Sequence, residues 1–573
     1  MPFTFNPFVF ACRARLFFLA CSFLGIASLA AGEEVFPPPF DTEPSPTKPL
    51  SANESANRIR LPAGFRATVF ASEPDVCQPM SMTTDARGRL WVADKDGDDV
   101  PDSAPEVLLD GFVYESGSHT VANGLKFGPD GWIYGRQGIL ATSLVGKPGT
   151  PEKQRTTVNV GIWRFHPTRH VFENVTYGTT NPWGMDWDSR GEMFFINTVI
   201  GHLWHGIPGA HYRRMSGGDL NPQIYDIIEQ HADHVHWATN EVWTDVRKGV
   251  TNATMEAGGG HAHTGLMIYQ GGQWPTQWNG KLLTVNYHGK RFNVERLERN
   301  GSGFVGRREP DAFIFDDPWF RGLDLIPSPD GNMYLSDWSD TGECHDNDGI
   351  HRSSGRIYKI CFGENQPSVI ADISQLETAD LIKHQLNSND WLARMSRRVL
   401  ANRAAHAALD GHSVSALKAI VQNDVNQAHR LRALWTLHVT NTSDTAQLTQ
   451  LLGDSDESIR VWAIRLLEDQ SHHDAKPREA FLQLVREQLP SFAKQEQSGL
   501  VRLALASLLQ KLPNEDRIAI ATALLTHEED EGDHNQPLLL WCGILPLAES
   551  SNGRFEQLIA ETEIPTVLQK PTR

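Results

Sequence analysis

Cysteine is scarce in this chain, and a haem-attachment motif is absent. The 573 residues include 6 cysteines. None of them belongs to a Cys-x-x-Cys or a Cys-x-x-Cys-His motif. Because a c-type haem is attached through Cys-x-x-Cys-His, the sequence excludes a covalently bound haem of that type.

Positive charge is also in short supply. The chain has 52 lysine and arginine residues against 70 aspartate and glutamate residues, for a net charge of −18. Proteins that bind nucleic acid present a basic face to the phosphates. We therefore expect no nucleic-acid partner.

Long apolar runs are confined to the N-terminus. Arg13 and Arg15 precede an apolar run from Leu16 to Ala31, which ends in small residues. The run is shorter than the roughly 20 residues of a membrane span. It predicts a signal peptide over residues 1–32 that is removed near Ala30–Gly32. Membrane anchoring by the same run is the alternative.

Removal of this leader predicts an extracytoplasmic protein, periplasmic or secreted, with no transmembrane span in the mature chain. Residues 33–60 are rich in proline, serine, threonine and glutamate. This composition is typical of a disordered linker.

A tight turn between two short apolar segments recurs along the chain. The clearest copy is 128–131, Gly-Pro-Asp-Gly, with Leu125 and Phe127 before it and Trp132 and Tyr134 after it. Proline presets φ for such a turn, and glycine accepts the positive φ. The glycines of the five similar turns are Gly88, Gly131, Gly191, Gly280 and Gly331.

Repeats of about 40–50 residues built from short strands are typical of propeller blades. Residues 61–362 are therefore predicted to form an all-β propeller of about six blades. A generic β-sandwich is the alternative and explains the spacing less well. An incomplete propeller is also considered, because Ala93 runs directly into an acidic loop.

The pattern changes to helical periodicity after a linker at 363–378. Trp391, Met395 and Val399 lie on one helical face, and similar segments follow. These segments each contain an arginine: Arg394, Arg432, Arg460 and Arg502. Residues 379–573 are thus predicted to form an all-α domain of HEAT-like repeats.

Four carboxylates alternate in the acidic loop that follows Ala93. Asp94, Asp96, Asp98 and Asp102 have the spacing of oxygen ligands in a calcium loop. The terminal glutamate of an EF-hand is missing from its usual place. The loop predicts a calcium site, and a solvated acidic loop is the alternative.

Histidines gather between His202 and His288. The densest groups are His231, His234 and His236, and then His261 and His263 behind three glycines. Neutral imidazoles in such numbers can bind a transition metal. Their spacing matches no zinc signature, so hydrogen-bonded loop histidines are the other interpretation.

Four longer motifs carry a resemblance to a known family. They are Tyr-Gly-Thr-Thr-Asn-Pro-Trp-Gly at 177–184, Gly-Gly-Gly-His-Ala-His-Thr-Gly-Leu at 258–266, Asp-Asp-Pro-Trp-Phe-Arg-Gly at 316–322 and Asp-Trp-Ser-Asp-Thr-Gly-Glu-Cys-His at 337–345. Together they resemble the propeller of the large planctomycete-type membrane-bound dehydrogenases. More distantly, they are similar to soluble sugar dehydrogenases that use pyrroloquinoline quinone.

This resemblance implies an exported, quinone-dependent dehydrogenase of a sugar or another alcohol. His119 would accept the hydroxyl proton, since imidazole titrates near neutral pH. Arg321 would stabilise charge on the reduced cofactor. Asn181 and Arg136 would bind the cofactor, and His119 and Arg321 would line one cleft.

The chain departs from the family pattern in two further respects. The C-terminal haem domain is missing, and Thr180 stands where the sugar dehydrogenases carry an arginine against the quinone. The alternative function is therefore a non-catalytic protein in which propeller and repeats recognise a protein or a polysaccharide.

Overall fold

A computed structural model describes most of the chain beyond its N-terminal segment. The described residues are 41–42, 48–93, 106–224, 227–238, 241, 249–342, 351–364, 372–472, 475–550, 553–564 and 567. They all belong to one compact unit, Pro39–Arg573. The predicted signal peptide and the carboxylates Asp94, Asp96, Asp98 and Asp102 lie outside the described residues.

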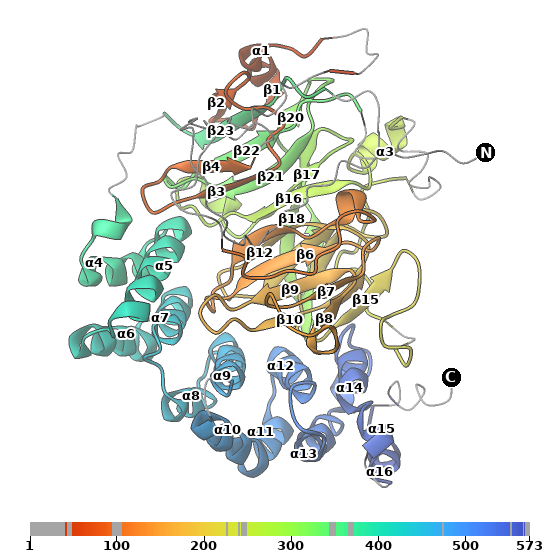
Figure 1. Ribbon diagram of the computed structural model, residues 1–573, viewed down its shortest axis with the longest axis vertical. Coiled ribbons are helices and arrows are strands. Elements are labelled where there is room, and N and C mark those ends of the chain that lie inside the picture. Colours follow the sequence, from red (N-terminus) through yellow and green to blue (C-terminus); the bar gives the residue numbers. More distant parts are fainter. Residues whose placement is uncertain are drawn as a thin grey trace, which may run out of the picture. The chain divides into compact units, whose positions relative to one another are not determined.

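The first half of the described chain consists mainly of small antiparallel sheets, with one parallel pair, β11 (Tyr177–Thr179) and β15 (His211–Arg214) (Figure 1). One sheet has the order β10 (Phe172–Asn174), β9 (Gly161–Phe165), β6 (Ile133–Gln137), β5 (Asn123–Phe127). Another has the order β12 (Pro182–Trp187), β13 (Met193–Asn197), β14 (Leu203–His205). A third has the order β16 (His263–Ile268), β17 (Leu282–Asn286), β18 (Arg291–Asn300), β19 (Gly303–Arg308).

The strands at the two ends of this region pair with each other. β2 (Phe65–Ser72) is the edge strand of a sheet that continues through β23 (Arg356–Phe362), β22 (Met333–Asp337) and β21 (Gly322–Pro327). β3 (Ser81–Thr84) pairs only with β4 (Leu90–Ala93). The remaining two-stranded pairs are β1 (Ile59–Arg60) with β20 (Ile314–Phe315), β7 (Ser143–Val145) with β8 (Thr156–Val158), and β11 (Tyr177–Thr179) with β15 (His211–Arg214).

Helices make up the second half of the described chain. In order they are α4 (Thr378–Lys383), α5 (Asp390–His406), α6 (Gly411–Asn423), α7 (Gln427–Val439), α8 (Thr445–Leu451), α9 (Glu457–Gln470), α10 (Ala475–Glu487), α11 (Leu489–Gln495), α12 (Gly499–Leu509), α13 (Asn514–Leu524), α14 (Gln536–Ile544), α15 (Leu547–Ser550) and α16 (Arg554–Glu561). Two short helices, α1 (Ala52–Asn57) and α3 (Asn252–Ala257), lie among the strands.

Polar residues set where several of these helices begin. The side chains of Asp410, Asp456 and Ser498 accept hydrogen bonds from backbone N–H groups in the first turns of α6, α9 and α12. Each bond satisfies a donor that the start of a helix leaves without an intrahelical partner.

The predicted turns bring the sheets against the helices. Gly131 and Gly191 have φ of +84° and +77°, and a Cβ on either would lie within 3.0 Å of α7 or α9 side chains. Trp132 Nε1 donates to Asp469 Oδ1 of α9 at 2.9 Å. One buried apolar cluster accordingly contains side chains from both the sheets and the helices.

The predicted succession of a β-rich region and a helical region is confirmed. Its small antiparallel sheets followed by helices fit a propeller-like domain and a helical domain. Closure of about six blades, HEAT-like repeats and the precise domain bounds stay predictions. Among the described residues, no helix is long and apolar enough to cross a lipid bilayer.

Candidate metal centre

Three imidazoles and one carboxylate converge between two of the sheets. The residues are His202, His234, His236 and Glu295, and their nearest ligand atoms all lie within 4.8 Å of one another. His202, His236 and Glu295 are buried, whereas His234 is half-buried. These histidines therefore form one cluster instead of lying on separate loops.

Different segments supply the four side chains. His202 immediately precedes β14, while His234 and His236 come from the segment 227–238. That segment is tied to β19 by a bond from the Gly306 N–H to the His231 carbonyl, 2.7 Å. It covers the face of β18 that carries Glu295, which is why a carboxylate there is buried.

Glycines make room for this packing. A Cβ on Gly258 would lie 2.4 Å from the ring of His236, and one on Gly306 would lie 3.2 Å from Glu295 Oε2. The predicted glycine run at 258–260 thus serves the histidine cluster directly.

The distances among the ligand atoms suit a transition metal. Glu295 Oε1 lies 3.0, 3.1 and 3.4 Å from the Nε2 atoms of His202, His234 and His236. The Nε2 atoms of His234 and His236 are 3.2 Å apart. Ligands of a tetrahedral zinc ion with bonds of about 2.0–2.1 Å are themselves about 3.3 Å apart.

A chain of hydrogen bonds orients the ring of His236. His263 Nδ1 lies 3.2 Å from the His261 carbonyl, and His236 Nδ1 lies 2.7 Å from His263 Nε2. Burial lowers the pKa values of His236 and His263 well below the ordinary range, so both rings are neutral. His263 Nδ1 then donates to the carbonyl and its Nε2 accepts from His236, whose own Nε2 keeps a lone pair.

This lone pair faces a carboxylate oxygen. Burial alone would raise the pKa of Glu295. Hydrogen bonds with His202 and His234 lower this pKa by more than burial raises it, so Glu295 is an anion. Two lone pairs 3.4 Å apart repel in a buried site. A cation between them removes the repulsion. Glu295 Oε2, also buried, has no hydrogen-bond partner within the described part of the chain.

His234 has the outer contact that metal-binding histidines commonly have. Its Nδ1 lies 2.8 Å from Asp233 Oδ1, which directs Nε2 toward Glu295. Burial opposes protonation, but hydrogen bonds to Glu295 and Asp233 raise the pKa of His234. A surface recess of about 550 Å³ reaches this ring past Gln230 and Trp237. The cluster is therefore open to solvent on the side where His234 lies.

The residues expected to serve a quinone lie elsewhere. His119 belongs to a 3₁₀ turn, Ser118–Thr120. The carbonyl of Thr120 accepts from the Gly138 N–H at 2.8 Å, and Asn181 Oδ1 lies 2.9 Å from where a Gly138 Cβ would be. Thr120, the residue after His119, and Asn181 thus both contact Gly138. Asn181 Oδ1 is buried and has no hydrogen-bond partner among the described residues.

The two arginines differ in their surroundings. Arg321 donates to the carbonyls of Pro318, Phe320, Thr341 and Gly342, and its guanidinium lies 5.1 Å from the centre of the Tyr287 ring. A bound anion would have to compete with these carbonyl oxygens for the N–H donors of Arg321. The shared cleft of His119 and Arg321 and the cofactor roles of all four residues stay predictions.

Arg136 extends from β6 into the interior. Burial lowers its pKa to about 10, although Asp324 opposes that effect. Its Nε is buried and has no hydrogen-bond partner among the described residues.

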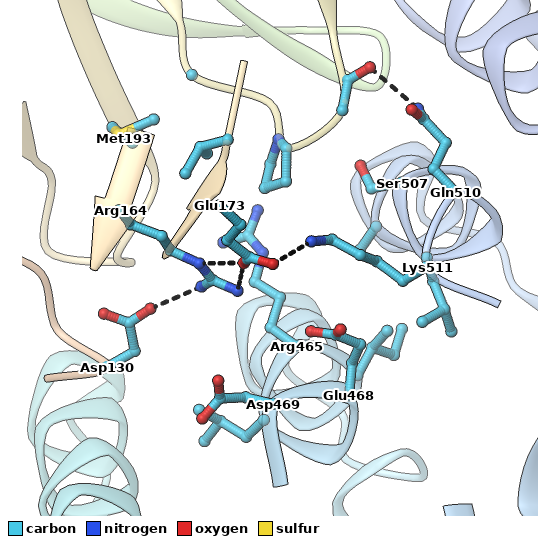
Figure 2. A pocket seen from close by; sticks show the side chains of 18 of the residues that line it. Asp130, Arg164, Glu173, Met193, Arg465, Glu468, Asp469, Ser507, Gln510 and Lys511 are labelled. Carbon is cyan, nitrogen blue, oxygen red and sulfur yellow. Dashed lines mark hydrogen bonds and ion pairs between the residues drawn. The ribbon is translucent and has the colours of Figure 1, made fainter. Parts of the chain in front are cut away.

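A pocket of about 210 Å³ lies where the sheets meet the helices (Figure 2). Figure 2 shows Arg164 between Asp130 and Glu173, with Lys511 reaching Glu173 from α12's end. Arg465 likewise pairs with Glu192. Because these charged side chains form ion pairs with one another, we attribute the pocket to the contact between the sheets and the helices.

Sequence patterns revealed part of the metal cluster. The density of histidines was visible, but Glu295 was missed. β18 alternates Phe292 and Val294 with Asn293 and Glu295, which resembles a strand with one solvated face. Only the covering segment 227–238 shows that this polar face is buried.

Comparisons with known proteins give one family match. The model of a family described as "Domain of unknown function (DUF7133)" matches residues 51–94 and 92–362. No curated protein matches the chain.

Solved structures give weaker similarities. A glucose dehydrogenase described as an oxidoreductase from Thermus thermophilus is 14% identical, with 52% of this chain and 100% of that chain covered and a TM-score of 0.27. The PQQ-bound aldose sugar dehydrogenase from Streptomyces coelicolor is 13% identical, with 52% and 100% covered and a TM-score of 0.26. Both TM-scores lie below 0.5, so neither activity is transferred to this chain.

Proposed function

The chain belongs to the DUF7133 family, and we propose that it binds one divalent transition-metal ion through His202, His234, His236 and Glu295. The observation that supports this most is the convergence of three Nε2 atoms on one carboxylate oxygen. Three imidazoles and a carboxylate suit zinc, manganese or iron better than calcium, which prefers oxygen ligands alone.

The recess beside His234 supports a functional role for this ion. A site closed by protein on all sides is typical of a structural metal, whereas a catalytic metal keeps a position for water or substrate. An ion reached from this recess would polarise a bound oxygen or acidify a bound water. His234, whose ring Asp233 holds in place, would be the ligand beside the open side of the metal ion.

Metal analysis tests the proposal. Chelator-treated protein should take up one Co²⁺ per chain and acquire a visible absorption spectrum, and azide should change that spectrum if one position is open. Glu295→Gln and His236→Gln should abolish stoichiometric uptake. His205→Gln is the matched control, because His205 pairs with Glu192 in another buried site, 2.9 Å apart.

Two outcomes would contradict the proposal. One is wild-type protein that takes up no stoichiometric metal. The other is uptake that Glu295→Gln and His205→Gln reduce equally, since a loss of that kind reflects general damage to the fold.

The second candidate function is the quinone-dependent oxidation of a sugar or another alcohol. It is favoured by Asn181 Oδ1, which is buried, has no hydrogen-bond partner among the described residues and lies beside Gly138, which also contacts Thr120 next to His119. A bound quinone would supply the acceptor for the hydride. Asn181 would accept a hydrogen bond, His119 would take the hydroxyl proton, and calcium at Asp94–Asp102 belongs to the same hypothesis.

Reconstitution tests this second candidate. Protein incubated with pyrroloquinoline quinone and calcium should reduce an electron-accepting dye when given a sugar or alcohol, and His119→Ala should abolish the reaction. His412→Ala, an exposed residue of α6, should retain it. Failure of the wild type to bind the quinone in a calorimetric titration would reject this function without affecting the metal proposal.

A further inference from the structure

A second cavity, distinct from the metal cluster, lies between β3 and β5. It has a volume of about 360 Å³ and is bordered by β3, β5, β6, β21 and α5. Its lining includes neither the metal ligands nor His119, Asn181 and Arg321. Leu125 at its edge is 68% exposed, so solvent reaches the cavity.

The lining combines cations with apolar walls. Lys126, Arg136, Arg394 and Arg398 are the lining cations, and Asp324 is the lining carboxylate. The apolar walls come from Met82, Leu125, Ile326, Trp391 and Met395. A ligand that fits both must carry negative charge and an apolar part.

Two of the cations already have partners. Lys126 Nζ lies 3.3 Å and Arg394 Nη1 lies 2.6 Å from Asp186 Oδ1, a buried carboxylate behind the lining. The guanidinium of Arg398 lies 4.3 Å from the centre of the Phe127 ring. Because Arg394 also pairs with Asp390, Arg136 and Arg398 are the lining cations left to meet a negatively charged ligand.

Arg136 is the lining cation with an unsatisfied buried donor. Its residue is only 8% exposed, and its Nε has no hydrogen-bond partner among the described residues. The nearest carboxylate of the lining, Asp324, accepts the Met82 N–H through Oδ2 at 3.0 Å. A buried guanidinium donor without a hydrogen-bond partner is costly, since it has lost its hydration without receiving a bond in return.

Gly124 holds the guanidinium in this position. A Cβ on Gly124 would lie 1.5 Å from Arg136 Nη2, so a side chain at position 124 would collide with the guanidinium where it now lies. Arg136 pairs with Asn123 across the β5–β6 pair, and Gly124 lies in the register shift between Asn123 and Lys126. The local irregularity thus turns the donors of Arg136 toward the cavity.

We propose that this cavity binds a small organic carboxylate, with its carboxylate group on Arg136 and its apolar part against Leu125, Ile326 and Trp391. A guanidinium presents paired donors that match a carboxylate. The site goes beyond metal binding at the histidine cluster and requires neither that ion nor a quinone.

Hexanoate is the probe that tests the site. In the full-length protein at constant ionic strength, hexanoate should raise the thermal midpoint in a saturable manner, whereas the neutral analogue hexanol should not. Arg136→Met should abolish the hexanoate shift. Arg60→Met is the control and should retain it, because Arg60 forms an exposed pair with Asp316.

A second measurement keeps the result clear if a variant folds poorly. Without hexanoate, Arg136→Met should melt at least as high as the wild type, because methionine removes a buried cation with an unsatisfied donor while Lys126 still attracts Asp324. Its metal content should equal that of the wild type. Equal shifts by hexanoate and hexanol, an unchanged hexanoate shift in Arg136→Met, or no shift in the wild type would each overturn the proposal.

Discussion

Asp188 shows at the scale of one residue how a turn couples protonation to stability. Its Oδ1 accepts the N–H groups of Arg190 and Glu192, each at 2.9 Å. Burial and the neighbouring Glu192 charge raise the pKa of Asp188 from its ordinary 3.8 to about 7. The folded protein thus retains a proton that the unfolded chain loses between about pH 4 and 7.

Asp188→Asn should remove this dependence. Because the raised pKa stabilises the fold below about pH 4 and the stabilisation is lost as pH rises through 7, the variant should gain stability relative to the wild type with increasing pH. We expect a gain of at most about 4 kcal/mol at pH 8, since one pKa unit corresponds to about 1.4 kcal/mol, and none near pH 4. Urea unfolding at both pH values measures it, and a difference independent of pH would contradict the assignment.

At the scale of elements, the turns between strands serve as contact points for helices. Gly191 and Gly280 both have φ of +77°, but only Gly191 meets a helix. A Cβ there would lie 2.6 Å from the rings of Trp435 and Trp462, whereas nothing lies within 4 Å of a Cβ on Gly280. A comparison of these two glycines therefore separates the cost of the positive φ from the cost of close contact with the tryptophan rings.

Gly191→Ala should therefore destabilise the protein more than Gly280→Ala. The positive φ costs both variants about 1–2 kcal/mol, and the contact with the two tryptophans adds about 1–3 kcal/mol at Gly191. Chemical denaturation gives the two free energies of unfolding. Equal losses would show that the helices do not press on the 188–191 turn.

Asp469 of α9 accepts several hydrogen bonds where the sheets meet the helices. It accepts hydrogen bonds from Trp132 Nε1, from Arg169 Nη2 at 2.8 and 3.0 Å, and from His438 Nε2 at 2.8 Å. Asp469→Ala should cost about 3–5 kcal/mol, since it leaves a partly buried guanidinium without its partner. Glu549→Ala, on the surface, should cost little, and comparable losses in calorimetry would contradict this role.

At the scale of the whole molecule, sheets and helices should unfold together. One buried cluster includes Trp132 and Trp187 of the sheets as well as Trp435 and Trp462 of the helices. Because neither side can lose its partner without exposing this surface, far-ultraviolet and tryptophan signals should change at one denaturant concentration. Two separate transitions would show that the shared cluster does not couple the regions.

Removal of the proposed metal should also affect the whole molecule. The ion would join segments around His202, His236 and Glu295 that are distant in sequence, so binding would stabilise only the folded chain. At a free metal concentration of 100 times Kd, the gain is about 2.7 kcal/mol. Chelator should lower the melting temperature of the wild type and leave that of Glu295→Gln unchanged.

Local features of the fold could be predicted from neighbouring residues in the chain. The turn at 128–131 predicts its hairpin because proline and glycine restrict φ at adjacent positions, and α5 follows from the 3.6-residue spacing of Trp391, Met395 and Val399. These forces act between near neighbours in the chain. The family-derived roles of His119, Asn181 and Arg321 stay predictions, because no local pattern tests them.

Which polar residues contact one another depends on how distant segments pack. Glu295 joins His202, His234 and His236 because the segment 227–238 covers β18, and Arg136 is largely buried at a cavity that it shares with β3 and α5. Both outcomes depend on packing between segments far apart in the chain. Burial, which makes an uncompensated charge costly, is a property of that packing and has no counterpart in the order of the residues.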